Sequence, residues 1–438
     1  MSENIIVAGA GHGGLAAAAI LARNGFEVTV YEKRKRKGIG YDWTDTFDLY
    51  SLEAAQIKLP DDFTVEKSTN ITFVPPSENI IIVQDIDEES LTVKIERREL
   101  YDILIKNAED AGVKLVFGCE IKAPLFAGDR VVGVETDKHG KKYADLVIDA
   151  CGHQSVIRKN MPDCLGIQKE LGKNESFYVY RGLFEKGKEA LHKYKVYLMP
   201  DKTMGIGWVI SDKKYCDVLI GEFEPIDQAE VDRKLAFFRR NNSVLGKKLL
   251  RGGEFAEIPV RQTLSIIVAD GYAAIGDSAF MTVPLLGSGI SNSLKAAAIL
   301  SDVIINDETK TYSAETLWDY QKRYFEEIGS GMAKMAIVKC MLPKLTAEQV
   351  DYAFEKELIT RDELTISSGG FNLDTGIFKK AIALIKDKSL IGSLAGVGKD
   401  MGLLTAALAS MPEDFSRKKV LQWAARYDKL FESNENED

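Results

Sequence analysis

Cysteine and histidine are both scarce in this chain of 438 residues, which contains five of the first and four of the second. The cysteines form no CxxC pair and the histidines are dispersed, so we expect no metal site. An odd, scattered set of cysteines is typical of a reducing compartment and argues against a disulfide framework. Since no catalytic triad emerges either, the catalytic residues remain unknown from the sequence alone.

Long apolar runs are also missing. No stretch of about 20 residues is free of charge, which argues against a membrane-spanning helix. A strand is expected within the first ten residues, which leaves no room for a secretory signal. Acidic residues outnumber basic ones by 66 to 57, and a net charge of −9 disfavours nucleic acid as a partner. We therefore expect a cytoplasmic protein, with peripheral membrane contact left open.

Glycine, in contrast, is abundant, and its spacing near the start of the chain is informative. The stretch "IIVAGAGHGGLAAAAILARNGFEVTVYEKR" places Gly9, Gly11 and Gly14 in the pattern GxGxxG. The pattern lies between an apolar run, Ile5 to Ala8, and an alanine-rich segment with helical periodicity, Leu15 to Asn24. Strand, glycine turn and helix in this order predict a site for the pyrophosphate of a dinucleotide.

An acidic residue follows at the position that such a site requires. A second strand, Glu27 to Tyr31, ends at Glu32, whose carboxylate can accept both hydroxyls of an adenosine ribose. The basic run from Lys33 to Lys37 comes next. It has two interpretations, a solvated turn or a contact with the adenylate end of a cofactor.

Three later stretches decide which dinucleotide is expected. The first puts Arg97 ahead of a helix, and the second, "YADLVIDACGHQSVIR", is a buried strand followed by a turn. The third, "IIVADGYAAIGDSAFMTVPLLGSGISNSLKAAAIL", is a strand, a Gly-Asp turn, a proline loop and a helix. A flavin needs this third element, because its polar ribityl chain must be held far from the adenosine. Asp277 stands where it can accept hydrogen bonds from that chain, and the helix near Gly289 can direct its dipole at the flavin ring.

In this order, these motifs resemble those of the flavoprotein superfamily of aromatic hydroxylases and geranylgeranyl reductases, over about residues 1 to 310. The resemblance implies an FAD-dependent oxidoreductase. It implies FAD contacts at Gly9, Gly11, Gly14, Glu32, Arg97, Gly276, Asp277, Pro284, Gly287 and Gly289.

The geranylgeranyl reductases are the more similar branch, through the Gly-Asp turn and the segment "PLLGSGISNSLKAA". Of their aromatic substrate motif only Trp208 is kept, and Tyr41 and Trp43 stand after the second strand in a segment of this chain's own. We treat these three residues as candidate walls of a substrate pocket, with a core role as the alternative. Cys151 replaces the aspartate that is usual in the hydroxylases, and we interpret it as a small turn residue.

The fold class expected from these anchors is α/β with three parts. A discontinuous, Rossmann-like FAD-binding domain covers residues 1–160 and 256–310. Residues 161–255 contain four alternating segments and form an antiparallel-sheet substrate domain. Residues 311–438 form a helical C-terminal region, with capping boxes at Thr346 and Thr360, which serves as a lid, a dimer surface or plain packing.

Three functions remain open at this stage. The first is a reductase that saturates a carbon–carbon double bond of a small apolar, isoprenoid-like substrate. The second is a monooxygenase that hydroxylates an aromatic substrate, and the third is a non-catalytic FAD-binding protein. Since only one strand–glycine–helix nucleotide unit occurs, the electron donor is expected to be a transient NAD(P)H or a reduced carrier protein.

Overall fold

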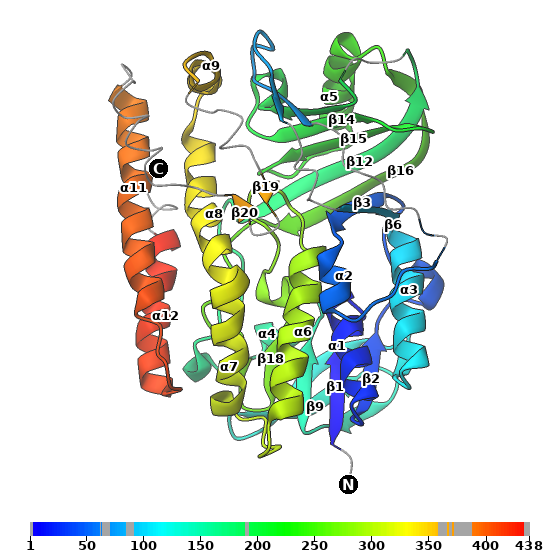
Figure 1. Cartoon of the computed structure of the whole chain (residues 1–438), viewed down its shortest axis with the longest axis vertical. Helices are drawn as coiled ribbons and strands as arrows, with labels where there is room; N and C mark the ends of the chain where they lie inside the picture. Colours follow the sequence, from blue (N-terminus) through cyan, green and yellow to red (C-terminus); the bar gives the residue numbers. More distant parts are fainter. Residues whose placement is uncertain are drawn as a thin grey trace.

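The molecule is built from two main sheets with long C-terminal helices alongside them (Figure 1). The computed structural model describes residues 3–61, 63, 71–84, 92–188, 192–357, 366–367, 370–371 and 388–432. In Figure 1 the seven-stranded sheet lies at the top and the six-stranded sheet below it, with α11 and α12 at the outer edge.

The six-stranded sheet is the predicted Rossmann-like element. Its strands run in the order β17-β18-β11-β1-β2-β7, and neighbours from β18 to β7 pair in parallel. The bounds are β1 (Asn4–Ala8), β2 (Glu27–Glu32), β7 (Lys114–Phe117), β11 (Leu146–Asp149), β17 (Val268–Ala269) and β18 (Tyr272–Ala274). The apolar run that predicts the first strand is β1, buried because helices and other strands cover it on both sides.

Helices and a small meander pack around this sheet. The helix α1 contacts both α3 and α6, and strand β9 of the three-stranded meander contacts β11. The bounds are α1 (His12–Arg23), α2 (Tyr50–Ala54), α3 (Arg97–Asp110), α4 (Val156–Lys159), α6 (Ile290–Asn306), β8 (Ile121–Ala127), β9 (Arg130–Thr136) and β10 (Gly140–Tyr143). Alanines on α1 allow the helix to approach the sheet closely, since all four from Ala16 to Ala19 are fully buried.

The seven-stranded sheet contains the four alternating segments that the sequence predicts as strands. Its order is β16-β12-β15-β14-β13-β4-β5. The bounds are β4 (Ile71–Val74), β5 (Ile82–Gln84), β12 (Ser176–Lys186), β13 (Tyr194–Leu198), β14 (Ile206–Ser211), β15 (Cys216–Glu222) and β16 (Leu245–Pro259). The sequence analysis missed β4 and β5, short apolar strands without alternation, and β4 pairs parallel to β13. The sheet is therefore mixed at one edge.

Two elements connect the sheets or cover them. The ribbon of β3 (Thr44–Asp48) and β6 (Thr92–Glu96) lies between the two sheets in Figure 1. The helix α5 (Gln228–Asn241) buries Val231, Leu235 and Phe238 against one face of the seven-stranded sheet. The opposite face of that sheet is therefore the one that points toward the ribbon.

The C-terminal part is mainly helical, as the sequence predicts. The bounds are α7 (Ala314–Tyr324), α8 (Ser330–Met341), α9 (Ala347–Glu355), α11 (Lys388–Ala409), α12 (Arg417–Glu432), β19 (Ile366–Ser367) and β20 (Gly370–Phe371). A capping box at Thr346 starts α9 and confirms that prediction. The capping box predicted at Thr360 lies outside the described residues. None of the helices in the described ranges is long and apolar enough to cross a bilayer.

Packing is the observed role of α12. Its Trp423 and Tyr427 rings stack on each other at 5.4 Å between centroids and surround Phe325. Asp428 on the same helix accepts a hydrogen bond from Ser265 Oγ at 2.8 Å. Burial raises the pKa of Asp428 to about 6, although Ser265 and Arg261 oppose the rise.

This raised pKa predicts a pH-dependent stability. The pKa of Asp428 is higher in the folded than in the unfolded chain. Its contribution to the stability of the folded chain is therefore full below pH 4 and is lost as the pH rises through 6. The free energy of unfolding of Asp428→Asn, relative to that of the wild type, should therefore rise by about 3 kcal/mol between pH 4 and pH 8. Urea unfolding at both pH values measures this, with the exposed Asp414→Asn as control. A constant difference between wild type and Asp428→Asn would contradict the prediction.

Candidate functional site

The glycine loop joins β1 to α1 and has the geometry that a phosphate site needs. Gly9 has a φ of +92°, and a Cβ built there would lie 2.5 Å from the carbonyl oxygen of Ala150. A Cβ on Gly14 would lie 2.6 Å from the Ala150 Cβ. Gly11 is the residue before the first turn of α1. Glycine is required at Gly9 and Gly14, because a Cβ at either would overlap Ala150. Without side chains there, the N–H groups at the start of α1, which have no partner within the helix, remain accessible.

Glu32 ends β2 beside this loop. Its Oε2 accepts the backbone N–H of Ala10 at 2.9 Å, and its Oε1 accepts the N–H of Arg34 at 2.8 Å. These two bonds hold the carboxylate against the loop. The basic run that follows forms a turn in which Arg36 makes an exposed ion pair with Glu109, as expected of a solvated turn.

The Gly-Asp turn predicted from the third stretch lies after β18. Gly276 has a φ of +63°, and Asp277 Oδ1 accepts a hydrogen bond from Thr282 Oγ1 at 2.6 Å. Gly289 precedes α6, and a Cβ there would lie 2.6 Å from Thr282 Oγ1 and 3.5 Å from Asp277 Oδ1. Gly287 has a φ of +66° in the loop that also contains Pro284. The missing side chain at Gly289 thus keeps the Asp277 carboxylate uncovered on that side.

The two glycine-rich segments meet in space. A Cβ on Gly13, in the first turn of α1, would lie 2.7 Å from the backbone oxygen of Ser293, in the first turn of α6. The amino-terminal ends of both helices therefore lie side by side, although about 280 residues separate them in the sequence. The contact joins the two glycine-rich segments, in which most of the FAD contacts are predicted.

A buried aspartate that the sequence analysis missed connects the turns behind this site. Asp149, the last residue of β11, is fully buried and accepts hydrogen bonds from Ser155, Tyr272, Ser278 and the N–H of Cys151. Its signal in the sequence was an acid at the end of an apolar strand. Burial and the Asp149 carboxylate raise the pKa of Tyr272 well above its usual value, so the phenol remains a hydrogen-bond donor.

Cys151 follows Asp149 in the turn. Its thiol donates to the carbonyl oxygen of Ala8 at 3.3 Å. Burial, together with Asp149, raises the pKa of the Cys151 thiol well above its usual value. A protonated thiol is a poor nucleophile, which supports its interpretation as a small turn residue.

The three aromatic residues predicted as pocket walls lie in one continuous stack. Tyr41 and Trp43 stack with ring centroids 4.3 Å apart. The guanidinium of Arg97 lies 5.1 Å from the Trp43 ring, and that of Arg181 lies 5.6 Å from the same ring. Arg181 also lies 5.2 Å from the Trp208 ring. We call these five residues the arginine–aromatic stack. It links the loop before β3 and the start of α3 to strands β12 and β14 of the seven-stranded sheet.

Arg97 is held in place by a buried carboxylate. Its Nε and Nη2 each donate to Asp45 at 2.6 Å. Burial opposes ionisation of Asp45, but the charge and hydrogen bonds of Arg97, together with the charge of Arg181, lower its pKa. His12, stacked on Tyr101 at 4.6 Å, lies beside this pair. Burial and Arg97 lower the pKa of His12 to about 3, so the imidazole is neutral at physiological pH.

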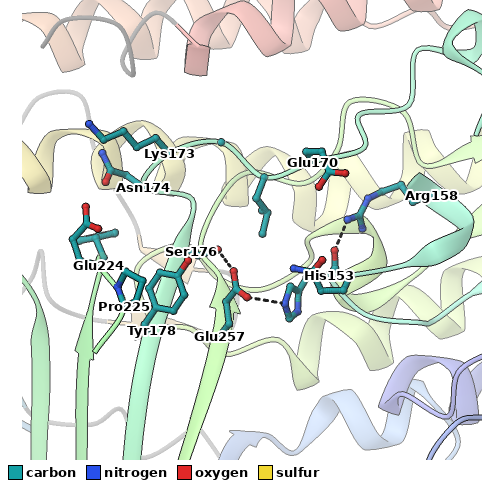
Figure 2. A pocket seen from close by; sticks show the side chains of 14 residues that line it. His153, Arg158, Glu170, Lys173, Asn174, Ser176, Tyr178, Glu224, Pro225 and Glu257 are labelled. Carbon is teal, nitrogen blue, oxygen red and sulfur yellow. Dashed lines mark hydrogen bonds and ion pairs between the residues drawn. The ribbon is translucent and has the colours of Figure 1, made fainter. Parts of the chain in front are cut away.

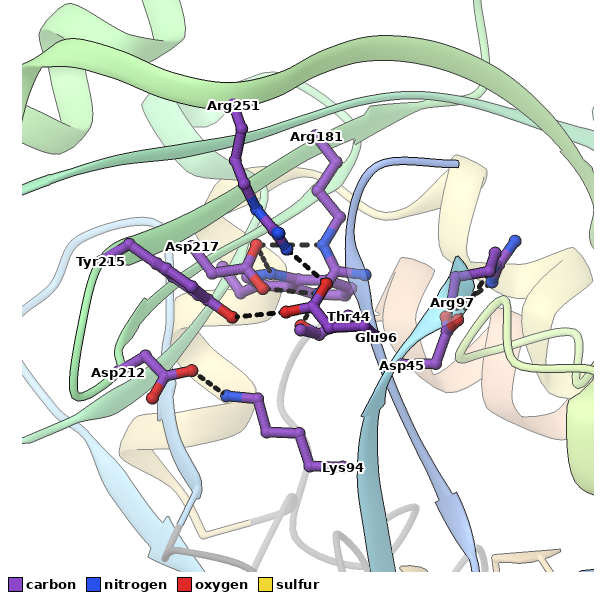
Figure 3. Close-up of polar contacts among 11 residues, drawn as sticks. Thr44, Asp45, Lys94, Glu96, Arg97, Arg181, Asp212, Tyr215, Asp217 and Arg251 are labelled. Atoms are coloured by element: carbon purple, nitrogen blue, oxygen red, sulfur yellow. Dashed lines mark hydrogen bonds and ion pairs between the residues drawn. The ribbon is translucent and has the colours of Figure 1, made fainter. Parts of the chain in front are cut away.

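A second buried ion pair lies on the sheet side of the stack (Figure 3). Arg181 Nε donates to Asp217 Oδ1 at 3.0 Å and Arg181 Nη2 donates to Asp217 Oδ2 at 2.5 Å. Asp217 is 1% exposed and Arg181 9% exposed. The sequence analysis missed both residues, whose only signal was a charge within an apolar strand.

Further ion pairs surround this core. Arg251 pairs with Glu96 and lies 3.7 Å from Asp42, while Lys94 pairs with Asp212 at 2.5 Å. Figure 3 shows Lys94 and Glu96 on β6, Arg251 on β16 and Asp212 in the turn before β15, around Arg181 and Asp217. Charged groups in this region are thus balanced within the protein itself.

A separate cavity of about 300 Å³ lies beyond the turn after β11 (Figure 2). His153 Nε2 lies 3.4 Å from Glu257 Oε2, and Ser176 Oγ donates to Glu257 Oε1 at 2.6 Å. Arg158 on the same wall is fully buried and donates to the carbonyl oxygen of Ser278 at 2.8 Å. The lining is polar, so this cavity suits a polar molecule better than an apolar chain.

Comparison with known proteins finds a family model and several reductases that match this chain. A family model described as an NAD(P)-binding Rossmann-like domain matches residues 7–75. The digeranylgeranylglycerophospholipid reductase of Sulfolobus acidocaldarius is 24% identical over 98% of this chain and 97% of its own length. The reductase of the same name from Haloferax volcanii is 23% identical, over 90% of this chain and 98% of its own length. Over almost its whole length the chain is therefore similar to reductases of the superfamily that includes geranylgeranyl reductases and aromatic hydroxylases.

Solved structures of this superfamily share the fold. A geranylgeranyl bacteriochlorophyll reductase-like protein from Thermoplasma acidophilum has a TM-score of 0.74 at 20% identity, over 90% of this chain and 99% of its own. A probable FAD-dependent monooxygenase from Pseudomonas aeruginosa has a TM-score of 0.60 at 17% identity, over 81% of this chain and 100% of its own. At these identities the likeness establishes the α/β fold and leaves the reaction open.

The close approach at Gly14 predicts a specific mutational effect. Gly14→Ala should destabilise the protein by about 1–3 kcal/mol, because the new methyl group overlaps Ala150 and the Gly9 carbonyl oxygen. Thermal unfolding measures this as a loss of several degrees in Tm. Gly38→Ala is the matched control, since no atom lies within 4 Å of a Cβ there and its φ is ordinary. Equal melting of the two variants would show that Gly14 packs more loosely.

Proposed function

We propose that this protein binds FAD and reduces a carbon–carbon double bond of an apolar, isoprenoid substrate. The observation that carries the proposal is the meeting of the α1 and α6 amino-terminal ends, with Glu32 and Asp277 at their flanks. The match to reductases over almost the whole chain supports the reaction type. A substrate of this kind also favours a cytoplasmic protein that works at the surface of a membrane.

The dinucleotide half of FAD fits the first glycine segment. A pyrophosphate needs backbone N–H donors without side chains in front of them, and Gly9, Gly11 and Gly14 provide this cradle. Glu32 provides acceptor oxygens for the ribose hydroxyls at the end of β2. We assign residues 1–160 and 256–310 to FAD binding on these grounds, apart from β4 and β5, which belong to the seven-stranded sheet.

The flavin half fits the second segment. Asp277 is oriented by Thr282 Oγ1, and the glycine at 289 leaves room beside its carboxylate. The start of α6 adds the positive end of a helix dipole, which stabilises negative charge nearby. Arg97, held by Asp45, contributes a fixed guanidinium within the arginine–aromatic stack.

The substrate would then lie against the arginine–aromatic stack. Tyr41 and Trp208 are half-buried and offer aromatic surface to an apolar chain, whereas Trp43 is buried between Tyr41 and the two arginines and keeps them in fixed positions. A rigid aromatic wall orients an apolar chain and excludes water from the reacting bond. We therefore assign residues 161–255, together with Tyr41 and Trp43, to substrate binding.

When bound, FAD would supply hydride transfer. Reduction adds one hydride and one proton across the double bond, so two electrons must reach the site from outside. NAD(P)H or a reduced carrier protein would provide them.

The cofactor assignment makes a direct prediction. The purified protein should be yellow and release FAD on denaturation, and Asp277→Ala should remain folded but lose most of its flavin, because an acceptor for the ribityl hydroxyls is removed. Absorption spectra and circular dichroism measure the two properties. Asp319→Ala, a change of the same kind on the exposed surface of α7, should keep its flavin. Full retention of FAD by Asp277→Ala would refute the assignment.

The main alternative is a monooxygenase that acts on an aromatic substrate, supported by the shared fold with such an enzyme. Oxygen consumption coupled to nicotinamide oxidation in the presence of an aromatic compound would favour it over a reductase. A flavin that no donor reduces at a useful rate would instead indicate a non-catalytic FAD-binding protein.

The route of the electrons gives a further prediction. We expect NADPH to reduce the bound flavin slowly and dithionite or a small reduced carrier protein to reduce it fast. The net charge of −9 disfavours docking of a polyanionic donor, and Cys151 lacks the carboxylate that helps to organise FAD and the nicotinamide donor in the hydroxylases. Stopped-flow reduction under nitrogen tests this. Rapid, saturable bleaching by micromolar NADPH would show that the substitution at Cys151 does not matter.

A further inference from the structure

The buried pair of Arg181 and Asp217 is unexpected in a wall that accommodates an apolar chain. Both side chains lie on the seven-stranded sheet, on adjacent antiparallel strands β12 and β15, and are almost fully buried. Burying two charges is costly, and a well-packed apolar pair would hold two strands together at least as well. The pair therefore calls for an explanation other than simple attachment of β12 to β15.

The guanidinium of Arg181 is only partly used by the protein. Its Nε and Nη2 bind Asp217, and Nη2 also approaches Thr44 Oγ1 at 3.4 Å. Within the described part of the chain, no hydrogen bond involves the remaining nitrogen, Nη1. An arginine carries five N–H donors in a rigid plane, so two of them are left to point away from Asp217.

The surroundings of Arg181 restrict where these donors can point. The guanidinium of Arg181 lies over the Trp43 and Trp208 rings, 5.6 and 5.2 Å from their centroids, so the two indoles cover part of it. Asp217 occupies the edge formed by Nε and Nη2. A further partner must therefore approach at Nη1. The Trp43 ring also lies under the guanidinium of Arg97, which we assign to FAD.

The local charge indicates what kind of partner fits. Arg97, Arg181 and Arg251 are matched by Asp45, Asp217 and Glu96, and Asp42 adds one more negative charge near Arg251. Lys94 and Asp212 cancel each other. An anionic group at Nη1 would therefore bring an uncompensated charge into a buried site, whereas an uncharged oxygen would not.

We propose that Arg181 determines specificity by donating a hydrogen bond from Nη1 to an uncharged oxygen of the substrate. It thereby selects an apolar chain that bears a hydroxyl, ether or carbonyl oxygen over the corresponding hydrocarbon. The proposal rests on the proposed function for the location of the substrate. Asp217, Trp43 and Trp208 act as positioning residues that hold the guanidinium in its plane.

The test uses the FAD-loaded protein and binding alone. Three probes share one chain, namely geranylgeraniol, the hydrocarbon without its hydroxyl, and the corresponding carboxylic acid. Binding is followed by the change in the visible absorption of the flavin and by quenching of tryptophan fluorescence. The wild type should bind the alcohol about tenfold or more tightly than the hydrocarbon, since a charged donor loses its partner in the second case.

Variants assign this preference to Arg181. Arg181→Met with Asp217→Asn removes both charges together, so that no unpaired carboxylate is left buried. This double variant should bind both probes with affinities within about twofold and keep the wild-type affinity for the hydrocarbon. Arg181→Lys keeps the charge but loses the planar fork, and should keep only part of the preference. Arg240→Met, an exposed change on α5, is the control and should bind like the wild type.

Several results would overturn the proposal. An unchanged preference for the alcohol in the double variant would show that the oxygen is bound elsewhere. Tighter binding of the acid than of the alcohol by the wild type would refute the charge argument. Failure of the wild type to bind any probe would also count against it. Since no turnover is needed, a protein that prefers the alcohol but reduces no double bond would contradict the proposed function alone.

Discussion

The close contact between the glycine loop and the turn after β11 is the constraint on which the rest of the site depends. Gly9 and Gly14 both pack against Ala150, at distances that no side chain could tolerate. This contact brings α1 onto the parallel sheet and leaves its first N–H groups free. Asp149, one residue earlier, then ties the turn after β11 to Tyr272 and Ser278, and hence to the Gly-Asp turn. One buried carboxylate therefore couples the two glycine segments.

The junction between the two sheets has a different physical character. It is held by paired charges and aromatic rings, with Trp43 between Arg97 and Arg181. Such pairs are weaker than apolar packing as a source of stability, but they fix orientation strongly because each partner permits few geometries. The arrangement suits a site whose walls must keep their position while a cofactor and a substrate enter and leave. His12, neutral and stacked on Tyr101, belongs to this junction as well.

His12 lies inside the glycine loop, but its ring stacks on Tyr101 and is close to the Arg97–Asp45 pair, which local spacing does not indicate. Tyr41, Trp43 and Trp208 were singled out one by one, and they do lie in one stack. Of the two arginines that join them, Arg97 was singled out from the sequence and Arg181 was not.

The sequence by itself determined the features that depend on neighbours along the chain. The strand–glycine–helix unit, the acid at the end of β2, the Gly-Asp turn and the four alternating strands all follow from local spacing, because backbone conformation and side-chain periodicity are local properties. Only the tertiary structure decided which distant residues meet. The pairing of β4 with β13, the four partners of Asp149 and the ion pair of Arg181 with Asp217 all join segments that local spacing does not relate. Such contacts depend on how whole elements pack. The role of a buried charged residue can be assigned only when its partner is known.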